Sequence, residues 1–218
     1  MIGRTKKGGV LAAASLVALA FSAVLAHASP QAADTDDKYK PAGMQVNGTS
    51  SHTTFSVPAT SPVITVTCTH SAAGGKTPAT GLGMFAINPL PVFNDGTGRP
   101  CTDSLGGTVT TTTSGAWKIG FVDKASDETS AEPSAGDKLQ IIIPKGGAVV
   151  HTSEGCTITV APSGAFTISG VYDDKSKLTL SIHNLPVATS GGSCPLPTST
   201  TSTFSATYTF SPGVSDAS

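Results

Sequence analysis

The sequence predicts an all-β, antiparallel β-sandwich with two disulfides, and helix only in an N-terminal signal peptide. Short apolar alternations of period two recur from residue 44 onward, which is typical of half-buried strands. Outside the first 28 residues, no ten-residue window has a helical stripe of apolar side chains. The four cysteines are an even number, as two disulfides in a secreted protein require. A chain made of strands must bury one face of each sheet against another, so a sandwich or a barrel is implied, and we expect the sandwich.

The N-terminus predicts secretion. Arg4, Lys6 and Lys7 precede an uncharged apolar run over residues 10–26, and Ala28 completes an Ala-His-Ala cleavage site. The run of about 17 residues is at the lower limit for a membrane span, so an uncleaved anchor is the alternative. We expect cleavage after Ala28 and a protein that is extracellular, with no membrane association afterwards.

The charge of the chain excludes two classes of partner. The whole chain has 13 basic and 14 acidic residues, and removal of residues 1–28 leaves 10 basic against 14 acidic, a net charge of −4. Arg99 is then the only arginine. Without a basic cluster, nucleic acid and anionic membrane are not expected partners, which leaves an unknown protein or carbohydrate.

One domain is expected in the mature chain. Residues 29–43 mix proline, aspartate and lysine without periodicity and are predicted to be a flexible leader, residues 44–212 the β-sandwich domain, and residues 213–218 a tail. About 190 residues can bury one sizeable core. Because residues 122–138 are the only break that resembles a linker, a weak twofold repeat of residues 44–122 and 138–212 is the alternative.

The strands are predicted from alternation, in chain order. Residues 139–143 are an exception, because apolar side chains fall on both faces and indicate a strand covered on both sides. In the C-terminal stretch, Phe204, Ala206, Tyr208 and Phe210 occupy every second position, which predicts a core strand rather than a Ser/Thr-rich stalk, with residues 199–202 as loop. The predicted strands are 53–57, 62–69, 83–87, 108–113, 115–123, 139–143, 148–152, 157–160, 165–169, 178–183 and 203–210.

The order of the cysteines suggests their pairing. Cys68 and Cys156 both lie in strand-like runs, and each is followed by another cysteine after 33 and 38 positions, respectively. We therefore expect the pairs Cys68–Cys101 and Cys156–Cys194, although sequence alone leaves the other two connectivities open. A redox role would need a CxxC pair or an unpaired cysteine beside a histidine, and neither is visible.

Several stretches carry a family resemblance. CTDSLGGTVTTTTSGAWKI, GCTITVAPSGAFTISGVYDD, the SCP turn and TFSATYTFSP resemble a group of uncharacterised secreted proteins of actinobacteria. The likeness covers most of residues 60–212. It implies an immunoglobulin-like or related β-sandwich and supplies no activity.

No catalytic, cofactor or metal site is predicted. His52, His70, His151 and His183 are not at the short spacings of metal ligands, and the GxSxG motif is absent. Asp173 and Asp174 fit a hairpin turn, with one member of a glycosidase carboxylate pair as the alternative.

Three further features have a functional alternative. The acidic loop over residues 123–137 fits a solvated connection, or else a calcium site. Leu196, in the segment 192–197 beside Cys194, has the setting of a protease-inhibitor loop. Trp117 fits a core position, or else a platform for a sugar ring; an apolar groove lined by Trp117 would favour ligand binding over a purely structural role.

The expected function is therefore a secreted, non-enzymatic protein with a binding or structural role at the cell envelope or in the extracellular medium. The alternative is a carbohydrate or small-ligand binding module, followed by a protease inhibitor and a secreted hydrolase.

Overall fold

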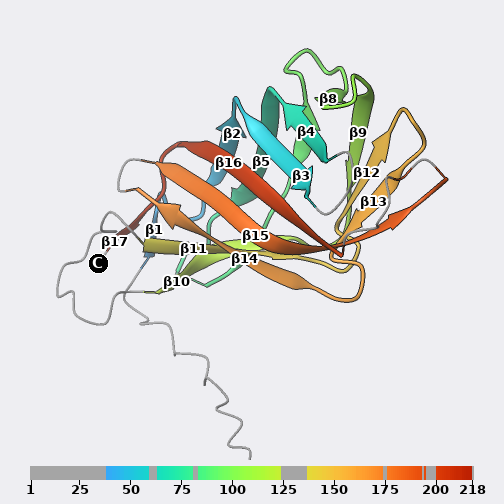
Figure 1. Ribbon diagram of the computed structural model, residues 1–218. Helices are drawn as coiled ribbons and strands as arrows, with labels where there is room; N and C mark the ends of the chain where they lie inside the picture. The colour runs from blue at the N-terminus through green and yellow to red at the C-terminus, as the bar shows by residue number, and fades with distance from the viewer. Residues whose placement is uncertain are drawn as a thin grey trace, which may run out of the picture. The chain divides into compact units, whose positions relative to one another are not determined.

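The computed structural model describes residues 38–58, 63–80, 83–123, 137–173, 176–192, 194 and 200–217. Within these residues every regular element is a strand, so the predicted all-β class is confirmed (Figure 1). No helix in the described part is long and apolar enough to cross a membrane. The predicted signal peptide lies outside the described residues. The strands are β1 (Lys38–Lys40), β2 (Gln45–Ser50), β3 (Thr53–Val57), β4 (Ile64–Cys68), β5 (His70–Lys76), β6 (Phe85–Ala86), β7 (Val92–Asn94), β8 (Cys101–Asp103), β9 (Thr108–Thr113), β10 (Lys118–Asp123), β11 (Asp137–Ile143), β12 (Ala148–Thr152), β13 (Thr157–Val160), β14 (Phe166–Tyr172), β15 (Lys177–Ser190), β16 (Thr201–Ser211) and β17 (Ser215–Ala217).

Eight strands form a closed barrel. Each pairs with the next in the order β15-β13-β12-β9-β8-β4-β3-β16, and β16 pairs again with β15. In Figure 1, β15 and β16 run side by side across the molecule, and the other six barrel strands lie on one side of them. Closure pairs each of these strands on both sides, so the ring has no free edge.

The remaining strands of the same sheet extend the barrel as two arms. One arm, β14-β11-β10-β6, continues from β15, and the other, β2-β5-β7, continues from β16. The arms meet where Gly75 of β5 forms an antiparallel bridge with Ile87, which directly follows β6. Both arms therefore contribute inner faces to the same interior.

This topology is a barrel with extra strands and not clearly the sandwich that the alternation predicted. The reason lies in the length of β15 and β16, each of which pairs with two strands along one edge. β16 pairs with β3 through residues 203–206 and with β2 through residues 209–211, while β15 pairs with β14 at one end and β13 at the other. The sheet thus branches at these two strands instead of dividing into two stacked layers.

A β-bulge keeps β15 facing the interior along its whole length. Between Ile182 and Leu185, β15 has one more residue than β16, and Asn184 takes the left-handed conformation with φ of 66°. Leu178, Leu180 and Ile182 are buried before the bulge, and Leu185 and Val187 are buried after it. Without the extra residue, the last two side chains would point to solvent.

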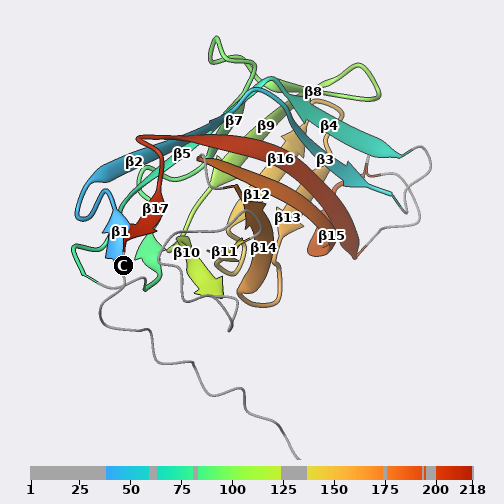
Figure 2. The same cartoon turned by 90° about the vertical axis from the view of Figure 1, so that its left-hand side faces the viewer.

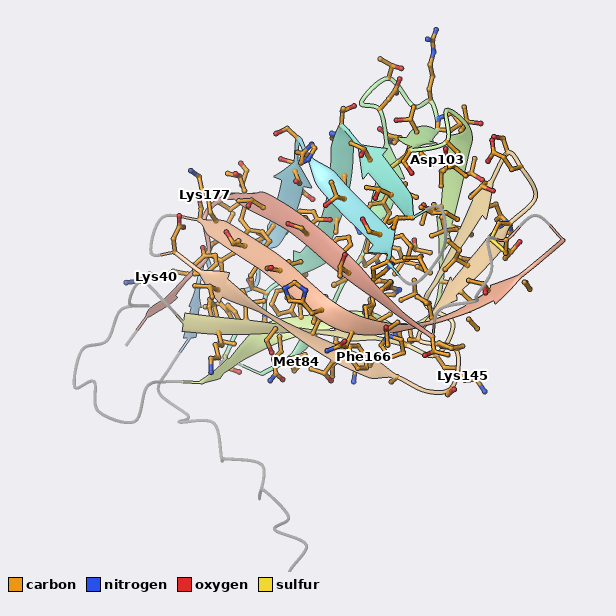
Figure 3. All side chains as sticks on the ribbon, in the orientation of Figure 1. Lys40, Met84, Asp103, Lys145, Phe166 and Lys177 are labelled. Carbon is orange, nitrogen blue, oxygen red and sulfur yellow. A yellow bond between two sulfur atoms is a disulfide. The ribbon has the colours of Figure 1, made fainter. Side chains whose placement is uncertain are left out.

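The C-terminal strand is confirmed as part of the core, and β16 begins at Thr201, inside the segment predicted to be loop. Ala206 and Tyr208 are buried and Phe204 and Phe210 are half-buried, whereas Ser205, Thr207 and Thr209 between them are exposed. The apolar and hydroxyl faces of β16 therefore separate as period two requires. Elsewhere on the molecule, charged side chains such as Lys145 and Lys177 lie at the periphery (Figure 3).

Both predicted disulfides are confirmed. Cys68 at the end of β4 is bonded to Cys101 of the neighbouring β8, and Cys156, just before β13, is bonded to Cys194. The four sulfurs are thus all paired, with no free cysteine in the described chain. Two structural disulfides are consistent with an extracellular protein.

Two short terminal strands pair with each other. β1 lies in the segment predicted to be a flexible leader and β17 in the predicted tail, and they form an antiparallel pair (Figure 2). Tyr39 of β1 is almost completely buried; its hydroxyl donates to the carbonyl of Gly83 at 3.3 Å and accepts from the amide of Phe121 at 3.2 Å. Ring packing of Tyr39 on Phe85 and Phe121 anchors this end of the chain to the sheet.

Candidate ligand-binding cavity

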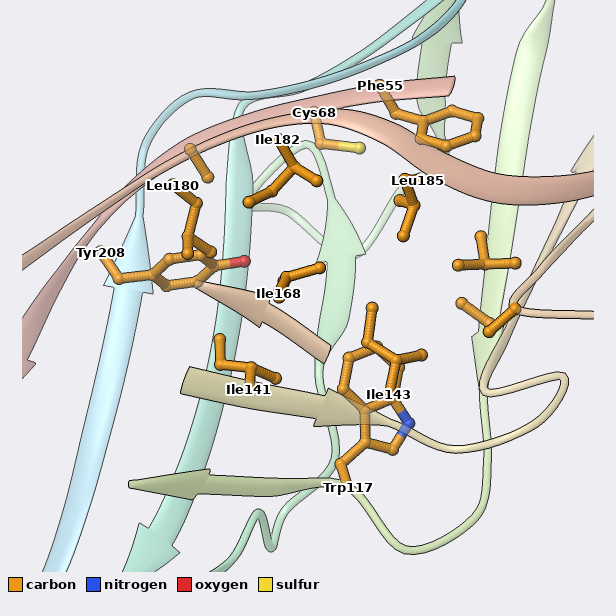
Figure 4. Packing of buried hydrophobic residues seen from close by; sticks show 14 of the residues in the cluster. Phe55, Cys68, Trp117, Ile141, Ile143, Ile168, Leu180, Ile182, Leu185 and Tyr208 are labelled. Carbon is orange, nitrogen blue, oxygen red and sulfur yellow. The ribbon is translucent and has the colours of Figure 1, made fainter. Parts of the chain in front are cut away.

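An apolar cavity of about 110 Å³ lies in the interior of the sheet. Its walls come from the barrel strands and from both arms. In Figure 4, Leu180 and Tyr208 approach from β15 and β16, while Ile168 and Trp117 approach from the arm that contains β14 and β10. The cavity is therefore built from residues that are far apart in the sequence.

Strand alternation explains why the cavity is apolar. Ile141 and Ile143 in β11, and Leu178 and Leu180 in β15, are buried and line it, and their neighbours with the opposite parity face away. None of the described residues that line the cavity is Lys, Arg, Asp, Glu or His. A charged ligand would lose its hydration there without gaining a counter-charge, which is strongly unfavourable.

Trp117 is part of this cavity wall. Its side chain is only 7% exposed, so it is not the exposed platform for a sugar ring that the sequence left open. The indole Nε1–H donates to the carbonyl of Ser114 at 2.9 Å and approaches that of Gly147 at 3.3 Å. The polar group of the indole is thus satisfied by backbone, and the ring is free to contact an apolar ligand.

A buried cluster of three hydroxyl groups adjoins the cavity. Ser71 Oγ of β5 donates to the hydroxyl of Tyr208 at 3.0 Å and lies 2.7 Å from Thr53 Oγ1 of β3. Thr53 and Tyr208 line the cavity, and all three residues are buried. We call Thr53, Ser71 and Tyr208 the hydroxyl cluster.

The Tyr208 phenol stays neutral across the physiological pH range. Burial raises its pKa above the ordinary tyrosine value, and the hydrogen bonds of Ser71 and Thr53 only partly oppose this effect. Tyr208 therefore retains a proton that it can donate.

A second, smaller cavity of about 40 Å³ lies toward the β1–β17 pair. It shares Gly48, Ile119 and Phe210 with the first cavity, and Tyr39 and Val214 form part of its wall. The hydroxyl of Tyr172 bonds both the carbonyl and the amide of Val214, which fixes the segment leading into β17. The paired termini thus close the sheet beside this end of the interior.

The candidate residues for metal or acyl-transfer chemistry are not brought together in the described part. His52, His151 and His183 are exposed, and the ring of His151 bonds Thr157 Oγ1 at 3.0 Å. No group of three or more His, Cys, Asp or Glu residues among the described residues could hold a metal ion.

The two acidic segments have different outcomes. Asp173 has the predicted turn role, because its carboxylate accepts from the amide of Lys177 at 2.6 Å and its own amide donates to the Lys177 carbonyl. Most of the acidic loop, residues 124–136, lies outside the described residues. The same is true of Leu196 and most of the Cys194 loop.

One buried carboxylate, that of Asp103, was not predicted from the sequence. Asp103 Oδ1 accepts from the amides of Leu105 and Gly107 at 2.8 and 2.9 Å, while Oδ2 is buried without a hydrogen-bond partner. The carboxylate of Glu154 lies beside it against Gly107, and the Ser153 hydroxyl lowers the pKa of Glu154. The Oδ1 bonds give Asp103 a structural role in the turn between β8 and β9.

Comparison of the chain with protein-family models, with curated proteins and with solved structures found no match. The resemblance to secreted actinobacterial proteins of immunoglobulin-like character therefore stays a prediction.

Proposed function

We propose that this protein is a secreted, non-enzymatic binding protein that holds a small, uncharged, apolar molecule in its central cavity. The observation that carries the proposal is the cavity of about 110 Å³, in which none of the described wall residues is charged. An engineered apolar cavity of about 150 Å³ in another protein binds benzene, so a molecule about the size of benzene is expected to fit the cavity of this protein.

The energetic cost of an empty cavity supports the proposal that a ligand fills it. Protein interiors are close-packed, and loss of contacts costs about 24 cal/mol per Å³ of cavity. For 110 Å³ this corresponds to roughly 2–3 kcal/mol of lost stability. A ligand that fills the space regains those contacts.

Secretion is part of the proposal. The charged N-terminus, the apolar run and the site after Ala28 favour export, and the two disulfides suit an oxidising compartment. Outside the cell, such a protein would capture or deliver its ligand without changing it chemically.

The test uses the intrinsic fluorescence of Trp117, the only tryptophan in the chain. Titration with benzene is expected to change the Trp117 emission and to raise the Tm with increasing benzene concentration. Ile168→Phe, which fills the cavity, is expected to lower benzene affinity at least tenfold. Val171→Phe is the matched control, because Val171 lies on the same strand and is 55% exposed.

Two outcomes would overturn the proposal. One is that benzene changes neither the Trp117 emission nor the Tm. The other is that Ile168→Phe and Val171→Phe bind benzene equally well, since binding would then lie outside the cavity.

A further inference from the structure

The carboxyl groups of Asp103 and Glu154 form a second candidate site, separate from the cavity. We infer that these two carboxylates, with the hydroxyl oxygens beside them, bind a calcium ion. Asp103 is the last residue of β8 (Figure 3), and Glu154 lies in the turn between β12 and β13. Neither residue lines the cavity, so this site does not depend on the function proposed above.

The pairing of the strands brings the two carboxyl groups together. β8 pairs with β9 and β9 pairs with β12, so the turns at their ends are neighbours. The amide of Ser153 donates to the carbonyl of Thr108 at 2.8 Å, and the amide of Thr108 donates to Ser153 Oγ at 3.0 Å. The carboxylate of Glu154 then lies over Gly107, where a Cβ would overlap it, and within hydrogen-bonding distance of the Asp103 carboxyl group.

One oxygen of this carboxyl pair is buried and has no donor. Asp103 is only 9% exposed, and its Oδ1 accepts from the amides of Leu105 and Gly107, whereas Oδ2 receives no hydrogen bond. The neighbouring Glu154 carboxylate, when ionised, supplies only acceptor oxygens. A buried, negatively charged oxygen without a donor is strongly unfavourable, so the pair needs a positive charge between its members.

The described residues do not supply this positive charge. Neither carboxylate forms an ion pair with a Lys, Arg or His of the described chain. A proton shared by the pair is the alternative, but carboxyl groups ordinarily lose their protons near pH 4. The hydroxyl of Ser153, which donates to Glu154 Oε1 at 2.6 Å, is the main cause that lowers the pKa of Glu154. At neutral pH a bound cation is therefore the better balance for the two charges.

The chemistry of the side chains favours calcium among the cations. The carboxylates of Asp103 and Glu154 offer oxygen ligands, and the hydroxyls of Thr152 and Ser153 lie beside Glu154. Oxygen ligands select hard cations. Calcium accepts an irregular set of carboxylates, neutral oxygens and water, whereas magnesium demands a nearly ideal octahedron and dehydrates reluctantly. With only two carboxylates, we expect a Kd of about 0.1–1 mM, as in extracellular calcium modules.

The test measures calcium binding to the whole protein after treatment with EDTA. Isothermal titration calorimetry with CaCl₂ is expected to give a Kd in that millimolar to submillimolar range, and the Tm should rise with the calcium concentration. The same titration with MgCl₂ at equal ionic strength is expected to raise the Tm less.

Two variants locate the site. Asp103→Asn keeps the Oδ1 acceptor for both amides and places an NH₂ donor beside Glu154, so it should fold, have a higher Tm in EDTA and bind calcium at least about tenfold more weakly. Gly107→Ala keeps both charges but displaces the Glu154 carboxylate, and it should also weaken calcium binding. The matched control is Asp173→Asn, at a turn carboxylate that accepts from the Lys177 amide, and it should leave calcium binding unchanged.

Four results would overturn the inference. The first is that calcium produces neither heat of binding nor a rise in Tm. The second is an equal response to magnesium, which would indicate screening by salt. The third is calcium binding by Asp103→Asn as tight as that by Asp173→Asn, because the ion would then bind elsewhere. The fourth is a loss of stability between pH 4 and pH 8 that calcium does not reverse, since the pair would then share a proton.

Discussion

Gly48 of β2 lies against the ring of Phe210 of β16, so closely that a Cβ on Gly48 would come within 2.8 Å of Phe210 Cε1. The two residues are register partners in the sheet, and both line the two cavities. The absence of a side chain at Gly48 therefore allows an aromatic ring to cover the backbone at this point.

The first prediction concerns this contact. Gly48→Ala forces the Phe210 ring to move, and we expect the free energy of unfolding to fall by about 1–3 kcal/mol, the usual cost of overpacking. Urea denaturation measures the change. Gly164→Ala is the control, since nothing lies within 4 Å of a Cβ at Gly164, and it should change stability by less than about 0.5 kcal/mol. Equal stability of the two variants would contradict the tight contact.

The second prediction concerns the bulge in β15. Asn184 has φ of 66°, a conformation that costs a β-branched residue about 1–2 kcal/mol. Asn184→Val is therefore expected to destabilise the fold by about that amount, whereas Asn184→Gly should preserve it. His183→Val, at the exposed neighbouring position, is the control for loss of a polar side chain. A stable Asn184→Val variant would show that the bulge does not depend on this backbone conformation.

Most strands were predicted from the local alternation of apolar and polar residues, and the strands that this alternation missed were missed for a physical reason. The aromatic spacing from Phe204 to Phe210 was sufficient to identify a core strand. β2 and β5 were missed, because Gly48, Gly74 and Gly75 replace the apolar residues expected at strand positions. Phe210 and Phe85 fill the space over Gly48 and Gly75, and such long-range partners cannot be identified from a short window of sequence.

Neither the closure of the barrel nor the presence of the cavity could be predicted from the sequence. The predicted strand 178–183 ended where the bulge begins, so the continuation of β15 to Ser190, which pairs with β13, was not recognised. Ser71 and Tyr208 are separated by 137 positions, and only the closed sheet brings their hydroxyls together. Only Trp117 gave a useful indication of the cavity, because it was predicted to be a core residue and it lies on the cavity wall.

The third prediction concerns alkaline pH. The chain has three tyrosines; burial raises the pKa of Tyr39 and of Tyr172 to about 12 and also raises that of Tyr208. A tyrosine in the unfolded chain ionises near pH 10, so the folded state holds its phenol protons more tightly. The resulting stability is fully present below about pH 10 and is lost as pH rises toward about 12.

Absorbance at 295 nm measures this titration. The folded protein is expected to show little tyrosinate near pH 10, followed by a rise that coincides with loss of the β-sheet signal in circular dichroism. A phenol with a pKa near 10 is mostly ionised at pH 10.5, so addition of urea at that pH should at once release most of the tyrosinate absorbance. An ordinary titration near pH 10 without unfolding would show that at least one of the three phenols is accessible.

The fourth prediction concerns the order in which the disulfides are reduced. Cys68 and Cys101 are 4% and 1% exposed, whereas Cys194 is only partly buried. Since a reductant must reach a sulfur atom, low concentrations of a phosphine reductant should open Cys156–Cys194 first, as detected by alkylation and peptide mass spectrometry.

Each bond closes a loop of 33 or 38 residues, so replacement of either pair by alanine is expected to cost about 4 kcal/mol in the chain-entropy description. The two bonds should therefore contribute similarly to stability while differing in reactivity, and alkylation of Cys68 or Cys101 before Cys194 would contradict the burial order.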